Sequence, residues 1–173
     1  MNNITQVLRG GIKMNAPNCQ CQTPEQLVGF GFRGWLAGYE YQSVAFWEMV
    51  WHAYVAALGS THAKLAVSDL SSWIRTIKHT TCRSIIILPT ECHHFCKDEC
   101  LAISIIAACQ HNQCPALHSC AHALLGSFEV DVMLNEASGF AKLLAENGQY
   151  LKLSSSCNVN NDDNCRYSTL THH

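Results

Sequence analysis

Residues 36–58 read LAGYEYQSVAFWEMVWHAYVAAL, and this stretch decides the fold class. Apolar side chains recur along one side of it at helical spacing: Val44, Trp47, Trp51, Val55 and Leu58. The other side of the same helix is also apolar, with Phe46 and Met49 among its residues. A helix that is apolar on every side is buried in the middle of a protein. We therefore expect a central helix that ends at Gly59.

Further helices are expected on both sides of this one. Upstream, Thr23 and Pro24 form a start signal, because threonine suits the N-cap and proline the first helical position. Downstream, apolar spacing and breaks at Gly, Asn and Pro place four more helices at about 64–79, 89–111, 115–126 and 130–147. The run Arg83–Leu88 fits a strand or a helical piece, and helix is favoured because no partner strand is apparent. The prediction is an all-α, single-domain bundle of four to six helices.

The ends of the chain differ from its body. Residues 1–24 are rich in Asn, Gln, Gly and Pro and are expected to form a polar N-terminal arm. Residues 25–153 carry the helical pattern and form the domain. Residues 154–173 are rich in Ser, Asn and Asp with little to bury, so a disordered C-terminal tail is expected there.

Composition excludes several classes of function. Only 14% of the 173 residues are charged, against about a quarter in typical proteins, and the formal net charge is −2. That charge and the scattered basic residues give no surface for nucleic acid. Residues 39–58 have the length of a membrane span, but Glu40, Glu48 and His52 oppose insertion in lipid. We expect no nucleic-acid partner and no membrane segment.

The eleven cysteines are the strongest functional signal. The first residues lack the apolar run of a signal peptide, which favours a cytoplasmic location. Cytoplasmic reductants keep thiols free, so cysteines grouped in such a chain indicate metal ligation or redox chemistry rather than a disulfide framework.

Six cysteines and histidines fall in two rows at four-residue spacing: Cys92, Cys96 and Cys100 in the first, Cys114, His118 and His122 in the second. Residues four apart on a helix lie one turn above each other on the same side. A row of three climbs about 12 Å, which is too far for all three residues to share one ion, so the simplest site takes a pair from each row. We expect Cys92 and Cys96 to meet His118 and His122 across two helices.

Thiolate and imidazole ligands in a tetrahedral arrangement suit Zn²⁺, which is the expected cofactor. If cysteine dominates the site, copper(I) becomes the alternative, and an iron–sulfur cluster is a weaker one. The nine-residue row from Cys92 to Cys100 resembles the C-x₃-C ligand spacing of four-helix copper-storage proteins. That resemblance implies copper(I) binding by thiolates of a helical bundle, but the many further C-x₃-C pairs of that family are missing here.

Other readings of the same residues stay open. Cysteine is among the most buried residue types, so the thiols can be reduced packing residues of a protein-protein interaction module or a homo-oligomer. A thiol-based redox sensor or an enzyme is a further alternative, although no local motif marks a catalytic base or an oxyanion hole. The leading expectation is a metal-binding sensor, carrier or assembly factor rather than an enzyme.

Residues 29–34, GFGFRG, match the glycine pattern of a dinucleotide-binding loop. That motif needs a hydrophobic strand before it, and the preceding residues do not form one. We interpret the glycines instead as points of close helix packing, with Gly34 and Gly38 letting backbones approach.

Overall fold

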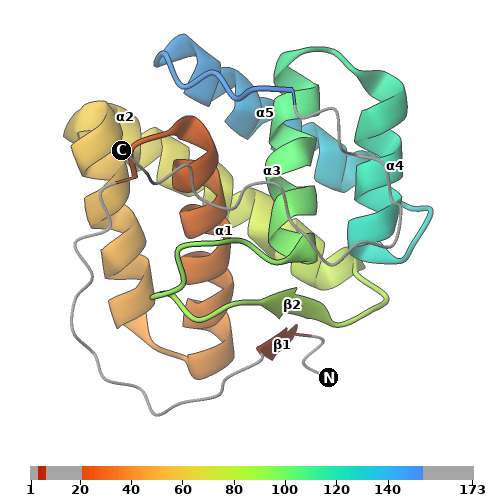
Figure 1. The fold of residues 1–173 in the computed structure, drawn as a ribbon, viewed down its shortest axis with the longest axis horizontal. Helices are drawn as coiled ribbons and strands as arrows, with labels where there is room; N and C mark the ends of the chain where they lie inside the picture. The colour runs from red at the N-terminus through yellow and green to blue at the C-terminus, as the bar shows by residue number, and fades with distance from the viewer. Residues whose placement is uncertain (1–3, 7–20, 154–173) are drawn as a thin grey trace.

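The computed structural model of the chain describes residues 4–6 and 21–153 (Figure 1). Those residues contain five helices, α1 (Pro24–Tyr41), α2 (Val44–Thr80), α3 (Lys97–Gln110), α4 (Cys114–Leu125) and α5 (Asp131–Glu146). Two strands of three residues each, β1 (Ile4–Gln6) and β2 (Ile85–Ile87), complete the fold. The all-α class is confirmed. The expected disordered tail, residues 154–173, lies outside the described residues.

Helix α1 begins where the sequence predicts. Thr23 is its N-cap, and the Thr23 hydroxyl accepts a hydrogen bond from the backbone amide of Gln26. The Gln26 side chain in turn accepts from the Thr23 amide, which completes a capping box.

The same helix carries Gly34 and Gly38. A Cβ on either glycine would collide with Val50 or Trp47 of α2, so both glycines permit the close approach that the sequence indicated.

The stretch 36–58 forms parts of two helices rather than one. Helix α1 ends at Tyr41 because Gln42 adopts a left-handed conformation, with φ 50° and ψ 41°. Ser43 is extended, and α2 starts at Val44. The expected end at Gly59 is a kink instead, since Gly59 takes φ 75° and ψ 160° and α2 then continues to Thr80. The expectation of one helix through Gln42 was wrong, whereas the break at Gly59 lies where the sequence places it.

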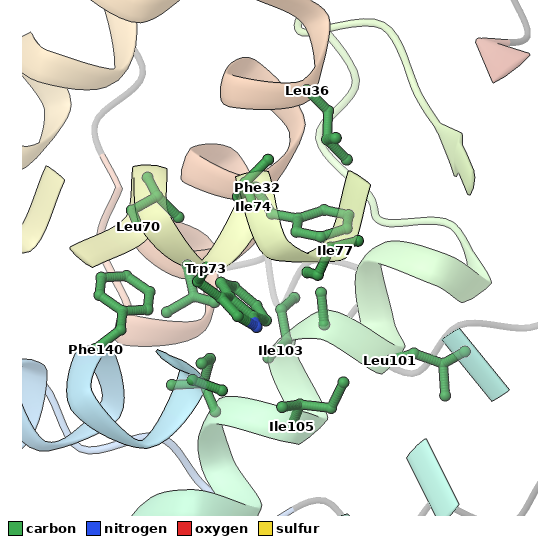
Figure 2. Packing of buried hydrophobic residues seen from close by; sticks show 14 of the residues in the cluster. Phe32, Leu36, Leu70, Trp73, Ile74, Ile77, Leu101, Ile103, Ile105 and Phe140 are labelled. Atoms are coloured by element: carbon green, nitrogen blue, oxygen red, sulfur yellow. The ribbon is translucent and has the colours of Figure 1, made fainter. Parts of the chain in front are cut away.

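The buried side chains form one hydrophobic cluster to which α1, α2, α3 and α5 all contribute. Figure 2 shows Trp73 of α2 within this cluster. Its ring lies 5.8 Å from that of Phe32 in α1 and 5.9 Å from that of Phe140 in α5. The indole Nε1 of Trp73 donates to the sulfur of Met133 at 3.1 Å, so even its polar atom is paired inside the core.

Residues 85–87 form a strand, which corrects the expectation of a helix there. Strand β1 of the N-terminal arm pairs in parallel with β2, with Ile4 opposite Ile85. Ile85 and Ile87 are buried, whereas Ile86 between them is exposed, as the period of two in a strand requires. The partner strand lies some eighty residues away along the chain, where local spacing gives no sign of it.

Helix α4 lies at the edge of the molecule in Figure 1 and packs chiefly against α3. Pro115, His118 and Ser119 on it are exposed. In the part of the chain that the structure describes, no helix combines the length and the apolarity of a membrane span.

Candidate metal site

The first predicted row, Cys92, Cys96 and Cys100, does not lie on one helix. Helix α3 starts at Lys97, so Cys92 is in the preceding loop, Cys96 is the N-cap, and only Cys100 is helical. The helix starts late because the Glu99 side chain accepts a hydrogen bond from the Cys96 amide at 2.8 Å, which caps the helix at that point. The expected helical alignment of these three cysteines is corrected accordingly.

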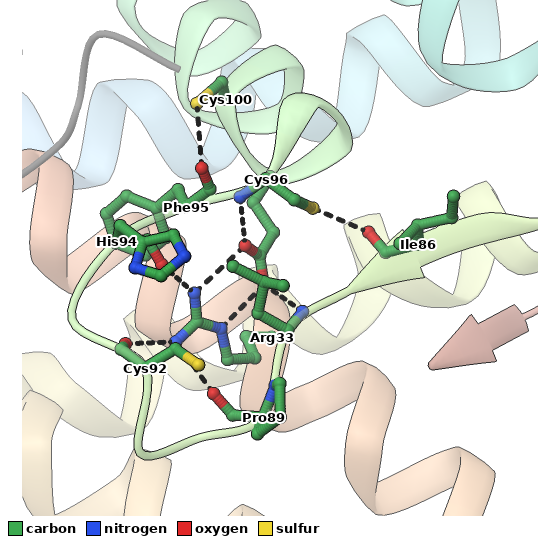
Figure 3. Close-up of polar contacts among 10 residues, drawn as sticks. Arg33, Ile86, Pro89, Cys92, His94, Phe95, Cys96 and Cys100 are labelled. Atoms are coloured by element: carbon green, nitrogen blue, oxygen red, sulfur yellow. Dashed lines mark hydrogen bonds and ion pairs between the residues drawn. The ribbon is translucent and has the colours of Figure 1, made fainter. Parts of the chain in front are cut away.

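The loop that carries Cys92 is fixed by a buried arginine (Figure 3). Arg33 of α1 is only 1% exposed and pairs with the fully buried Glu99, with 2.6 Å between Nε and Oε1 and 3.0 Å between Nη2 and Oε2. Its Nη1 also donates to the carbonyl oxygens of Pro89 and Cys92, and its Nη2 to that of His94. One guanidinium thus fastens three carbonyls of the loop to α1 and α3.

A second ion pair supports strand β2. Arg83 donates to both carboxylate oxygens of Asp98, at 2.9 and 3.0 Å, and Asp98 also accepts from the amide of Ile86. Glu99 likewise accepts from the amide of Leu88 at 3.1 Å. The two acidic residues in the first turn of α3 therefore bind arginines and backbone amides.

Cys96 acts as a structural thiol in this arrangement. Its Sγ donates to the carbonyl oxygen of Ile86 at 3.1 Å. Burial, and secondarily the negative charge of Glu99, raises the pKa of the Cys96 thiol to about 12. A thiol with this pKa stays protonated at neutral pH, whereas the thiolate is the form that binds metal.

The other cysteines of the first row also differ from the expectation. Cys100 is disulfide-bonded, whereas the sequence favoured reduced thiols throughout. A bridged sulfur offers no thiolate. Cys92 and Cys96 carry free thiols, and Cys92 is half-buried.

The second row is arranged as the sequence predicts. Cys114, His118 and His122 all belong to α4, so their four-residue spacing places them along one side of a helix. His118 is exposed and His122 is half-buried in the last turn. The ring of His122 meets that of Phe128 edge-on, with 5.0 Å between centroids.

The hydrogen bond of His122 fixes its tautomer. Nδ1 of His122 lies 2.8 Å from the backbone oxygen of Ser127. A carbonyl oxygen only accepts, so Nδ1 carries the proton of this bond. In the neutral ring the lone pair is then on Nε2, and a histidine held in this way is the form found in metal sites.

Cys92, Cys96, His118 and His122, the four residues of the simplest predicted site, do not form a group that could hold a metal ion. Among the residues with described side chains, no three or more histidines, cysteines or acidic residues are grouped so as to hold a metal ion. The set of Cys92, Cys96, His118 and His122 is therefore not preassembled. Metal binding itself stays a prediction, and the helical histidines of α4 are the part of it that has local geometry in its favour.

Arg33 and Glu99 are the residues that sequence reasoning missed. A signal was present, because Arg33 is the one charged residue between Leu27 and Tyr39 in a markedly apolar helix. A charge in such a position is buried and requires a partner of opposite sign. Nothing local identified Glu99, 66 residues away, as that partner.

Comparison of the chain with protein-family models, with curated proteins and with solved structures gives no match in any of the three. Functional assignment therefore depends on the chemistry of the residues themselves.

Proposed function

We propose that this chain is a metal-binding helical protein, serving as a sensor, carrier or assembly factor, and that it holds zinc through His118 and His122 of α4. The observation that carries the proposal is the hydrogen bond from Nδ1 of His122 to Ser127, which directs the lone pair to Nε2. Two imidazoles favour a borderline ion such as zinc. Copper(I) and an iron–sulfur cluster lose support, since burial disfavours the thiolate of Cys96 and Cys100 is bridged.

The spacing of the two histidines suits joint ligation. Residues four apart on a helix have their Cβ atoms about 5–6 Å apart, and zinc–nitrogen bonds are about 2.0–2.1 Å long, so two rings from such positions can reach one ion. Paired histidines at this spacing hold zinc in helical metalloproteases. Cys114 is a further turn away, and the row climbs about 12 Å in all, which is too far for three donors to share one ion.

The electrostatics of the helix end favour a cation as well. His122 lies in the last turn of α4, where the carbonyl ends of the peptide dipoles point outward. Helix C-termini attract positive charge for this reason. The helix contains no Lys or Arg of its own, but the guanidinium of Arg83 donates to the carbonyl oxygen of Leu124 at 2.9 Å and already uses part of this negative potential.

Calorimetric titration with zinc tests this function. Two pairs of adjacent histidines, His172 and His173 at the chain end and the exposed His93 and His94, are replaced by alanine in every version, because adjacent histidines bind zinc by themselves. In that background, we expect His122→Ala or His118→Ala to weaken zinc binding by at least about tenfold, the usual loss when a metal ligand's arrangement is disturbed. His52→Ala, which removes an exposed histidine of α2, is the matched control and should leave the affinity unchanged.

Spectroscopy of the protein with cobalt(II) in place of zinc distinguishes a site with imidazole ligands alone from one that also has a thiolate ligand. Coordination by two imidazoles gives ligand-field bands without a thiolate charge-transfer band, whereas participation of Cys114 adds that band. Zinc affinity that survives both histidine replacements would contradict the proposal.

The second candidate is an interaction module with structural cysteines. Phe128 favours it, because this aromatic side chain is 91% exposed in the turn between α4 and α5. Cys96 also fits it, as a thiol that caps a helix and pairs with a strand carbonyl. A cysteine enzyme is disfavoured at Cys96, since the raised pKa removes the nucleophilic thiolate.

A further inference from the structure

We propose that the zinc ion bridges two copies of this chain, each of which supplies His118 and His122 from α4. This inference rests on the function proposed above and names its partner. It follows from the number of donors, the position of α4, its charge and the apolar side chains beside it.

The ligand count leaves the site half complete. Zinc in structural sites is almost always bound by four ligands in a tetrahedron. Helix α4 offers two imidazoles, and no cluster of three donors occurs among the side chains that the structure describes. An identical pair from a second copy supplies the two missing donors. A two-fold axis through the ion then relates the copies, which is the commonest symmetry of protein dimers.

The position of α4 allows two copies to approach. The helix packs chiefly on α3 and lies at the edge of the molecule in Figure 1, so one side of it faces outward. His118 is on this side together with Pro115 and Ser119, and both of those are exposed and small.

The charge of α4 also permits self-association. Across a two-fold axis, any charged residue near the axis meets its own copy, and like charges so placed repel. The sequence of α4, CPALHSCAHALL, contains no residue of fixed charge. Helix α4 itself therefore brings no fixed charge to the axis, whereas the exposed Glu129 and Asp131, next to Phe128 and Val132 in the sequence, add negative charge to this end of the face.

An exposed aromatic side chain contacts His122, and a second apolar side chain is exposed four residues further along the chain. Phe128 is 91% exposed and contacts the ring of His122, and Val132 in the first turn of α5 is 66% exposed. Large apolar side chains exposed together mark an interaction surface. In the bridged dimer Phe128 and Val132 of each copy cover the His122 side of the metal site and exclude water from it.

Sedimentation equilibrium of the full chain, with both pairs of adjacent histidines replaced by alanine, tests the bridge with zinc chloride as the probe. With zinc we expect the mass to double at half an ion per chain, and with EDTA we expect it to return to that of one chain. His122→Ala should stay monomeric with zinc, while its circular dichroism stays helical.

Phe128→Ser and Leu65→Ser form a matched pair, because both remove an exposed apolar side chain but Leu65, 52% exposed, lies on α2. We expect Phe128→Ser to raise the dissociation constant of the zinc dimer by roughly tenfold, because the variant loses the free energy gained by burying an aromatic ring. Leu65→Ser should change it by less than about twofold. Equal effects of the two substitutions would place the interface elsewhere.

The outcomes distinguish this inference from the function on which it rests. A monomer that binds one zinc through His118 and His122 overturns the bridge and keeps the metal site. A dimer that persists in EDTA overturns the bridge too, and favours the interaction module. A chain that binds no zinc overturns both proposals.

Discussion

Arg33 organises more of this fold than any other polar side chain described. A buried guanidinium costs free energy unless opposite charge and hydrogen-bond acceptors compensate for its lost water. Here Glu99 neutralises it, and the carbonyls of Pro89, Cys92 and His94 accept its remaining donors. The shape of the Cys92 loop is therefore a consequence of arginine coordination.

Removing that guanidinium should be costly. Arg33→Met leaves Glu99 charged and buried without its partner, and we expect a loss of about 3–5 kcal/mol in the free energy of unfolding. Urea denaturation followed by circular dichroism measures it. Lys142→Met is the control, since Lys142 and Glu146 form an exposed pair at 3.8 Å that contributes under about 1 kcal/mol. Similar small losses in both variants would contradict the role assigned to Arg33.

Cys96 gives a second prediction at this scale. The pKa of its thiol is about 12 in the folded chain, against a usual value of 9.0. At pH 8 the fraction of thiolate is therefore about a thousandth of the fraction in an ordinary cysteine. We expect iodoacetamide to modify Cys96 only after unfolding in urea, while the exposed Cys82 reacts in the folded protein. Mass spectrometry of peptides reports both sites. Rapid native modification of Cys96 would show that the thiol is not held as described.

The raised pKa of Cys96 also makes the free energy of unfolding depend on pH. The folded state binds the Cys96 proton more tightly than the unfolded state, so the stabilising contribution is complete below pH 9.0. It is lost as pH rises from there through about 12. The alkaline limb of the unfolding free energy should accordingly be shallower in Cys96→Ala, a difference that urea titrations at several pH values measure.

At the scale of elements, the sequence predicted a helix boundary correctly where the contacts that stabilise the boundary are local. Thr23, Pro24 and Gln26 cap α1 within four residues of one another, and the start of that helix was predictable. The start of α3 depends on a cysteine N-cap and on Glu99, which is itself held by Arg33. Cysteine is not among the usual N-cap residues, so Pro89 was the stronger local signal and it misplaced the boundary.

Strand β2 depends even more on contacts that are distant in the sequence. One edge of it pairs with β1, and on the other Asp98 binds the amide of Ile86 while Cys96 binds its carbonyl. Side chains from the start of α3 thus take the place of a neighbouring strand. A three-residue run of isoleucine carries none of this information.

Gly59 provides a test at the level of the helix. Its φ of 75° and ψ of 160° belong to a region open almost only to glycine, while no atom lies within 4 Å of an added Cβ. Gly59→Ala should therefore cost about 1–3 kcal/mol through the backbone alone. Gly139→Ala is the matched control, because that glycine is within α5 with equally open space, and alanine there should stabilise by about 1 kcal/mol. Thermal and urea unfolding of both variants check the opposite signs.

At the scale of the whole molecule, apolar periodicity was enough for the fold class. Trp73, Phe32 and Phe140 meet in one core because each lies on an apolar helix side that the sequence displays. The candidate site was predictable only within one element. His118 and His122 share a side of α4 as their spacing indicates, but whether Cys92 and Cys96 reach them depends on how α3 begins and where α4 packs. The start of α3 depends on Arg33 and Glu99, and the end of α4 is held by Arg83 and the amide of Cys82, all of which lie outside both rows.

A ligand that binds only the folded state stabilises the whole molecule by mass action. At a free zinc concentration about a hundredfold above Kd, the gain is about 2.7 kcal/mol, which corresponds to a rise in Tm of roughly 5–10 °C for a chain of this size. We expect this rise with both pairs of adjacent histidines replaced, and its loss in His122→Ala but not in His52→Ala. If zinc bridges two copies, the Tm with zinc also increases with protein concentration, because the unfolding reaction then dissociates a dimer. The same increase of Tm in His122→Ala would assign the zinc to other residues, and a Tm independent of protein concentration would leave a metal site confined to one chain.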